Sequence, residues 1–190
     1  MKIADLHCDT ISEIWKSRRA GRPQQLFQNN LHVDIQKMQK AGYLLQNFAM
    51  YIDLEKTSDP FAAVSEQMDV FYDEMEKNKD CIGIVTSYHE ILANEKQGKM
   101  SALMTIEEGG CCKGELENLE TLYQRGARMM TLTWNYPNEL AGPNLPADSF
   151  GAFDSTKGLT RKGFAFIQRM EEIGMILDVS HLSDAGFWDI

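Results

Sequence analysis

The segment ADLHCDTI, residues 4 to 11, places a histidine and an aspartate, His7 and Asp9, two positions apart behind a short apolar run. Side chains alternate along a strand, so His7 and Asp9 share one face and Cys8 takes the other. An imidazole nitrogen and a carboxylate oxygen are the ligands that hydrolytic metal sites combine. The pair therefore offers two ligands to one metal ion, although a strand-end histidine that hydrogen-bonds a loop carbonyl also fits it.

Similar residues follow two later apolar runs of strand length. Glu107 and Glu108 stand before two glycines in TIEEGG, and His181 ends MILDVSH. A carboxylate can bridge two metal ions about 3.5–4 Å apart, and either glutamate is a candidate for that role. Singly, EEGG fits a charged turn and DVSH fits a helix cap. Their shared position at strand ends favours a metal site.

The elements that must position these residues alternate between strand and helix. Strand-like apolar runs cover residues 2–10, 43–52, 98–110, 127–134 and 175–181, and helical spacing covers 60–79, 115–126 and 160–174. In the last helix, Phe164, Ile167 and Met170 lie on one side. This order predicts one α/β domain over residues 1–190, with a parallel sheet covered by helices.

Two architectures fit that order, an open doubly wound sheet and a closed (β/α)8 TIM barrel. The chain has no GxGxxG or GxxxxGK[ST] pattern, which argues against a nucleotide-binding open sheet. In a barrel, residues at the carboxyl ends of strands meet at the mouth, where active sites are built. We therefore expect a (β/α)8 barrel with about its first five β/α units present and its C-terminal strands lacking.

Composition limits the partners and the compartment. The formal charge of −9, without a basic cluster, argues against nucleic acid and anionic membranes as partners. No run approaches the roughly 20 apolar residues that span a bilayer, and no signal peptide precedes Asp5, so we expect a cytoplasmic protein. The four cysteines lack CxxC spacing, which fits a reducing compartment and argues against a zinc finger.

Four segments together resemble the membrane (renal) dipeptidase family, the zinc-dependent M19 peptidases, in its bacterial form. They are DLHCDT, TIEEGG, TLTWNYPNELAG and GLTRKGFAFIQRMEEIGMILDVSHLSDAGFWD, and the likeness runs from residue 3 to residue 190. The resemblance implies a barrel of the metal-dependent hydrolase type whose two zinc ions hold a hydroxide that hydrolyses dipeptides. It also implies that the protein forms a homodimer, as family members often do.

The resemblance also assigns residues. His7 and Asp9 would bind the first zinc, His181 would bind the second, and Glu108 would be the catalytic bridging ligand because the family's glutamate directly precedes two glycines. Many animal members have a substrate-contacting histidine after the T-L-T triplet, where this chain has Trp134. Trp134 and Asn135 are therefore the expected substrate-binding residues.

One departure from the family leaves alternatives open. The family's second-zinc histidine on strand six, its substrate-binding arginine and a later aspartate would all fall beyond Ile190. A metal-binding or inert remnant that holds at most one metal ion is therefore the first alternative. The second is a related amidohydrolase acting on a cyclic amide, although such enzymes usually carry H-x-H on the first strand rather than H-x-D.

Overall fold

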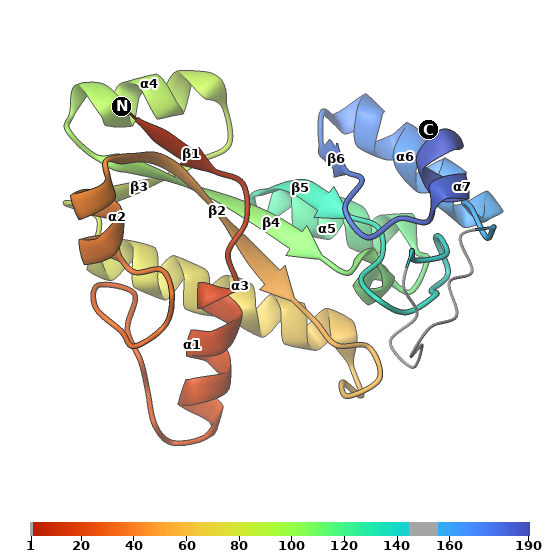
Figure 1. Ribbon diagram of the computed structural model, residues 1–190, viewed down its shortest axis with the longest axis horizontal. Coiled ribbons are helices and arrows are strands. Elements are labelled where there is room, and N and C mark those ends of the chain that lie inside the picture. The colour runs from red at the N-terminus through yellow and green to blue at the C-terminus, as the bar shows by residue number, and fades with distance from the viewer. Residues whose placement is uncertain (1, 145–155) are drawn as a thin grey trace. The chain divides into compact units, whose positions relative to one another are not determined.

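The computed structural model describes residues 2–144 and 156–190. Parallel strands and helices alternate along these residues (Figure 1). None of the helices in the described ranges is both long and apolar enough to cross a bilayer. The elements in chain order are β1 (Ile3–Asp5), α1 (Thr10–Arg19), α2 (Ile35–Ala41), β2 (Tyr43–Tyr51), α3 (Pro60–Lys77), β3 (Ile82–Val85), α4 (Tyr88–Lys96), β4 (Met100–Glu107), the 3-10 helix η1 (Gly109–Cys112), α5 (Leu116–Gln124), β5 (Ala127–Thr131), α6 (Arg161–Ile173), β6 (Ile176–Asp178) and α7 (Asp184–Trp188).

The expected alternation is confirmed, with two differences in the strands. The first strand ends at Asp5, earlier than the apolar run suggested. A strand that the sequence analysis missed, β3, lies between α3 and α4. It has four residues, and so short an apolar run gives little periodicity to recognise.

By its internal contacts the chain divides into two compact units, and the single domain over residues 1–190 stays a prediction. The first unit contains residues 1–50 and 65–105, and the second contains residues 51–64 and 106–190. The strand β4 begins in the first unit and ends in the second.

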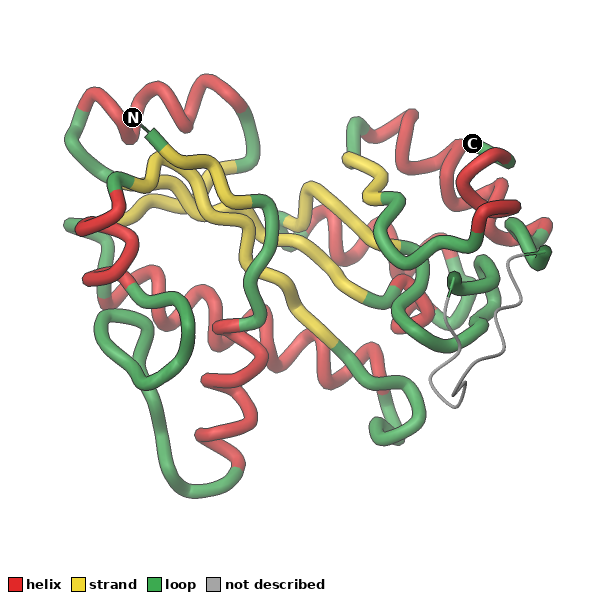
Figure 2. The backbone as a smooth tube through the Cα atoms, viewed as in Figure 1, coloured by secondary structure: helices red, strands yellow, loops and turns green. Residues whose placement is uncertain are grey.

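The first unit is built on parallel strands. β1 pairs with β2 in parallel, with Ile3 opposite Tyr43, and β3 pairs with β4 in parallel, with Ile82 opposite Met100. β2 lies between β1 and β4 in the sheet order. Figure 2 shows these strands running side by side. The segment after β1 continues along β2, because the Cys8 N–H donates to the Asn47 carbonyl and the Ala49 N–H donates to the Cys8 carbonyl.

Helices α1 and α3 pack onto these strands through fully buried apolar side chains. Phe48 of β2 meets Phe71 of α3 edge to face, with ring centroids 6.0 Å apart, and Ile11 of α1 is fully buried. The buried Glu74 of α3 pairs with Arg18 of α1. The free-energy cost of burying a charge is offset when the charge is paired and hydrogen-bonded. The pair of Glu74 with Arg18 holds α1, the helix that directly follows His7 and Asp9, against α3.

In the second unit, β5 pairs with β6 in parallel, and α5 and α6 bury Leu119, Leu122 and Phe166. Helix α6 begins where the Thr160 hydroxyl accepts a hydrogen bond from the Gly163 N–H. Its buried positions are Gly163, Phe166 and Met170, whereas Phe164 is half exposed. The helix is therefore confirmed, but its buried stripe lies beside the one that the sequence analysis expected.

Candidate metal centre

His7 and Asp9 lie in the segment between β1 and α1, in the first unit. Hydrogen bonds from the Cys8 N–H to the Asn47 carbonyl (3.1 Å) and from the Ala49 N–H to the Cys8 carbonyl (2.9 Å) hold this segment along β2 beyond the end of β1. The strand alternation therefore continues, with Cys8 buried and the side chains of His7 and Asp9 about half exposed. Burial raises the pKa of the Cys8 thiol to about 12, so Cys8 is an inert packing residue here.

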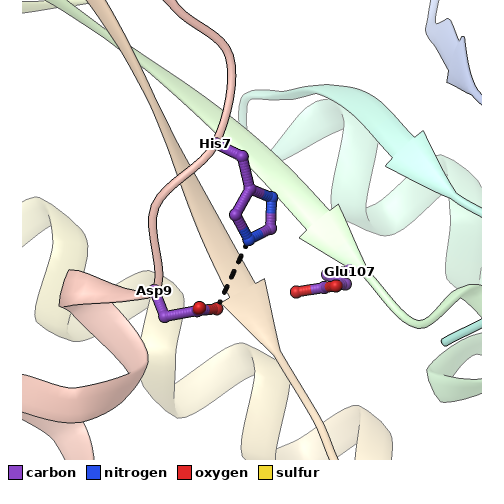
Figure 3. A group of neighbouring side chains, drawn as sticks. All are labelled: His7, Asp9 and Glu107. Atoms are coloured by element: carbon purple, nitrogen blue, oxygen red, sulfur yellow. Dashed lines mark ion pairs between the residues drawn. The ribbon is translucent and has the colours of Figure 1, made fainter. Parts of the chain in front are cut away.

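The two exposed side chains face each other. His7 Nε2 lies 3.5 Å from Asp9 Oδ1, and Figure 3 shows the imidazole ring directed at the carboxylate. The same figure labels Glu107, the last residue of β4; all three are of residue types that bind metal ions. Glu107 belongs to the second unit and is described there with its own partner.

A second pair of a histidine and a carboxylate occurs in the second unit. His181 Nε2 lies 3.4 Å from Glu107 Oε1, and Glu107 is almost completely buried. His181 has a left-handed backbone with φ +66°, and its carbonyl accepts a hydrogen bond from the Asn144 N–H at 2.7 Å. A left-handed conformation is uncommon for a residue other than glycine. The backbone of His181 is thus held in the position from which its ring reaches Glu107.

The adjacent Glu108, the expected bridging ligand, has different surroundings. Its carboxylate accepts hydrogen bonds from the backbone N–H groups of Gly110 and Trp134, both at 2.8 Å, and from the side-chain amide of Asn138. Burial raises the pKa of Glu108 to about 7, while these hydrogen bonds oppose the rise. The structure thus directs Glu108 into the loop after β5, and it is Glu107 that faces His181.

The spacing within both pairs fits a metal ion. An N–H···O hydrogen bond spans 2.7–3.2 Å, so separations of 3.4 Å and 3.5 Å are longer than a good hydrogen bond. Two ligands held about 2.0–2.2 Å from a tetrahedral zinc lie about 3.3–3.6 Å from each other. Each pair combines a nitrogen and an oxygen ligand at that separation, so the residues of each unit fit one zinc ion.

The two expected substrate-binding residues lie on the loop that follows β5. The half-buried Trp134 packs edge to face against Tyr51, with ring centroids 5.1 Å apart, and against Tyr136, at 5.6 Å. The Asn135 Oδ1 atom lies 3.2 Å from His181 Nδ1. Trp134 therefore belongs to an aromatic group, whereas Asn135 contacts a candidate metal ligand. The sequence showed no signal for that contact, because 46 residues separate the two.

Comparison with known proteins places the chain in a family. A family model of the membrane dipeptidases, peptidase family M19, matches residues 1–190. The chain belongs to the membrane dipeptidase family. This confirms the resemblance found in the sequence, and members of this family are metal-dependent peptidases.

Curated relatives agree with this membership. An uncharacterized protein in the PQQ-III 3′ region of Acinetobacter calcoaceticus is 24% identical over 208 residues, which cover 98% of this chain and 65% of the relative. Dipeptidase verJ of Clonostachys rogersoniana is 28% identical over 123 residues, which cover 65% of this chain and 30% of the relative. The chain therefore spans less than two thirds of the length of these relatives.

Solved structures show the same fold. A metallo peptidase from Rhodobacter sphaeroides, crystallised with a phosphinate mimic of the dipeptide L-Ala-D-Ala, matches with a TM-score of 0.85 and 17% identity. The dipeptidase AC, a metallo peptidase of family M19, matches with a TM-score of 0.83 and 18% identity. Both matches cover the whole of this chain and 61% and 59% of the other chains. The expected fold class is confirmed: the parallel strands are those of a partial (β/α)8 barrel of the membrane dipeptidase type.

Proposed function

We propose that this protein is a zinc-dependent dipeptidase with a binuclear centre. One observation carries the proposal: a chain of the membrane dipeptidase family has two imidazole–carboxylate pairs, each with the spacing of two ligands on one zinc ion. Hydrolytic zinc sites are built from such nitrogen and oxygen ligands with a position left open. The small substrate would be a dipeptide, while a cytoplasmic location and a homodimer stay predictions.

His7 and Asp9 would hold one zinc ion and His181 would hold the other. We assign the bridging position to Glu107 in place of Glu108. The Glu108 carboxylate already accepts three hydrogen bonds, whereas Glu107 Oε1 faces the imidazole nitrogen of His181. A carboxylate has about four lone-pair sites, so three accepted hydrogen bonds leave Glu108 little capacity for a metal ion.

Zinc, when bound, would polarise the peptide carbonyl and lower the pKa of water. The residues of this chain would do the positioning. Glu107 supplies a buried carboxylate, whose charge attracts cations more strongly than an exposed one would. The rings of Trp134, Tyr51 and Tyr136 offer a dipeptide an aromatic surface, which supports substrate contact by Trp134.

A metal-exchange assay tests this function. Purified protein is stripped with a chelator, reloaded with zinc, and supplied with a panel of dipeptides and with a cyclic imide. We expect zinc-dependent cleavage of dipeptides with two zinc ions bound. Binding of one zinc ion or none, without cleavage, would overturn the proposal in favour of the remnant. Activity on the imide alone would overturn it in favour of the cyclic amidohydrolase.

A further inference from the structure

The two ring nitrogens of His181 face two different partners of the second unit. Nδ1 lies 3.2 Å from the Asn135 side-chain oxygen, and Nε2 lies 3.4 Å from Glu107 Oε1. We propose that Asn135 is a positioning residue whose amide oxygen accepts the Nδ1–H of His181 and leaves the Nε2 lone pair directed toward Glu107. The inference rests on the proposed function only in treating His181 as a metal ligand.

The chemistry of neutral imidazole makes this contact decisive. The ring carries one proton, and the nitrogen that carries it cannot bind a metal ion. Glu107 Oε1, at 3.4 Å from Nε2, lies beyond the range of a good hydrogen bond, whereas Asn135 Oδ1, at 3.2 Å from Nδ1, lies within it. Without Asn135 the carboxylate would be the one acceptor of this pair of partners, and the proton would favour Nε2. An acceptor at Nδ1 offers the proton a different partner. Histidines that bind metals commonly donate their second N–H to such an acceptor.

The structure holds both members of the contact in place through the backbone. The N–H of Trp134, next to Asn135, donates to the buried Glu108 carboxylate at 2.8 Å. Asn138 binds the same carboxylate and donates to the Leu132 carbonyl at 2.8 Å, which closes the loop around Glu108. On the other side, a hydrogen bond from the Asn144 N–H fixes the carbonyl of His181. These contacts hold the loop segment that carries Asn135.

The opposite orientation of the amide makes a different prediction. If the Asn135 NH2 group donated to Nδ1, the proton of His181 would sit on Nε2 and block metal binding. Amide orientations are inferred from their hydrogen-bond partners, so a substitution must decide. Asn135→Asp is suited to this, because a carboxylate accepts but does not donate. Asn135→Ala removes the acceptor altogether.

Nitrogen NMR of the metal-free, ¹⁵N-labelled chain reads the tautomer directly. The signals of the four histidines are assigned with a His181→Asn variant. We expect the Nδ1–H form of His181 in the wild type and in Asn135→Asp, and a shift toward the Nε2–H form in Asn135→Ala. A wild-type ring in the Nε2–H form, or one that Asn135→Ala leaves unchanged, would overturn the inference.

Zinc affinity, measured by competition with a coloured chelator, gives a second readout. Loss of such an outer partner typically weakens metal binding by roughly 10–100-fold, so we expect that loss in Asn135→Ala and recovery to within a few-fold in Asn135→Asp. Gln124→Ala, an exposed amide on α5, is the matched control and should bind zinc as the wild type does. Equal affinity of wild type and Asn135→Ala would contradict the inference. A wild type that binds no zinc would instead contradict the proposed function, and the NMR result would still decide the role of Asn135.

Discussion

Glu107 and Glu108 show how neighbouring residues of identical chemistry come to differ. Both are buried, yet Glu107 faces His181 and Glu108 faces three N–H donors. The backbone causes the difference: Glu108 has φ +85°, in the left-handed region, where the chain leaves β4 and turns into η1. The hydrogen bonds that the Glu108 carboxylate accepts offset the energetic cost of this left-handed backbone conformation.

The substitution Glu108→Gln should lower the free energy of unfolding of the metal-free chain by about 1–3 kcal/mol. The glutamine side chain keeps one oxygen that can accept a hydrogen bond. Its NH2 group, however, would face an N–H donor that the Glu108 carboxylate satisfies in the wild type. Urea unfolding followed by circular dichroism would measure the change. The exposed Glu117 of α5 provides the control, Glu117→Gln, which should unfold as the wild type does. Equal stability of both variants would mean that the Glu108 contacts carry no net energy.

Asp34 gives a pH-dependent prediction in the first unit. It is buried and caps α2, accepting hydrogen bonds from the Lys37 N–H (2.8 Å) and the Asn29 N–H (3.2 Å). Burial works to raise the pKa of Asp34, but the hydrogen bonds from Lys37 and Asn29 outweigh it and hold that pKa below 3.8. The ionised form is therefore favoured by folding, so its contribution is present above pH ~4 and disappears as the pH falls through the folded pKa.

We expect Asp34→Asn to be less stable than the wild type at pH 7, by about 1 kcal/mol. The difference should shrink when the pH falls from 5 to 3, because only the wild type loses a charge that folding favours. Urea unfolding across that pH range would measure it. Asp80→Asn, at an exposed position in the turn after α3, should show no such convergence. A gap that stays constant with pH would contradict the account of Asp34.

At the scale of elements, α6 shows packing overriding helix propensity. Gly163 lies in its first turn, where alanine would ordinarily favour the helix. A Cβ atom at Gly163, however, would collide with the Leu140 carbonyl oxygen, which is backbone and cannot swing away. The glycine is therefore needed for close approach of the helix to the loop after β5.

The substitution Gly163→Ala should lower the melting temperature, with a loss of about 1–3 kcal/mol in the free energy of unfolding. Gly98→Ala is an informative comparison, because its Cβ would meet no atom within 4 Å while its φ of +71° is strained for alanine. We expect a loss of only about 1 kcal/mol there. Calorimetry would compare the two. A larger loss at Gly98 than at Gly163 would show that backbone strain, rather than the collision, dominates.

The elements also show what the sequence could predict. Long periodic segments such as α3 were recognisable because Pro60 starts the helix and apolar residues recur at helical spacing. The four residues of β3 were not, since so short an apolar run shows little periodicity. Of the predicted stripe of α6, Met170 is buried, whereas Phe166 is buried in place of Phe164. The two phenylalanines are equally apolar, and only tertiary packing decides which is buried.

At the scale of the whole molecule, the family could be recognised from the sequence, whereas the roles of the metal-site residues stay predictions. His7, Asp9 and His181 were predicted from spacing and resemblance; in the structure His7 lies beside the Asp9 carboxylate and His181 beside that of Glu107. Glu108 was chosen from the EGG pattern, and a pattern does not report the left-handed backbone at this residue; which of the two glutamates binds metal stays a prediction. The contact of Asn135 with His181 likewise depends on folding that brings distant segments together.

Zinc stoichiometry of two isosteric variants tests the account most directly. The wild type, Glu107→Gln and Glu108→Gln are loaded with zinc well below their melting temperatures, and bound metal is measured by plasma mass spectrometry after gel filtration. We predict that Glu107→Gln loses bound zinc, because the bridging ligand is weakened, whereas Glu108→Gln binds as much as the wild type. Full zinc content in Glu107→Gln together with loss of zinc in Glu108→Gln would contradict the assignment of Glu107 and restore Glu108 as the ligand.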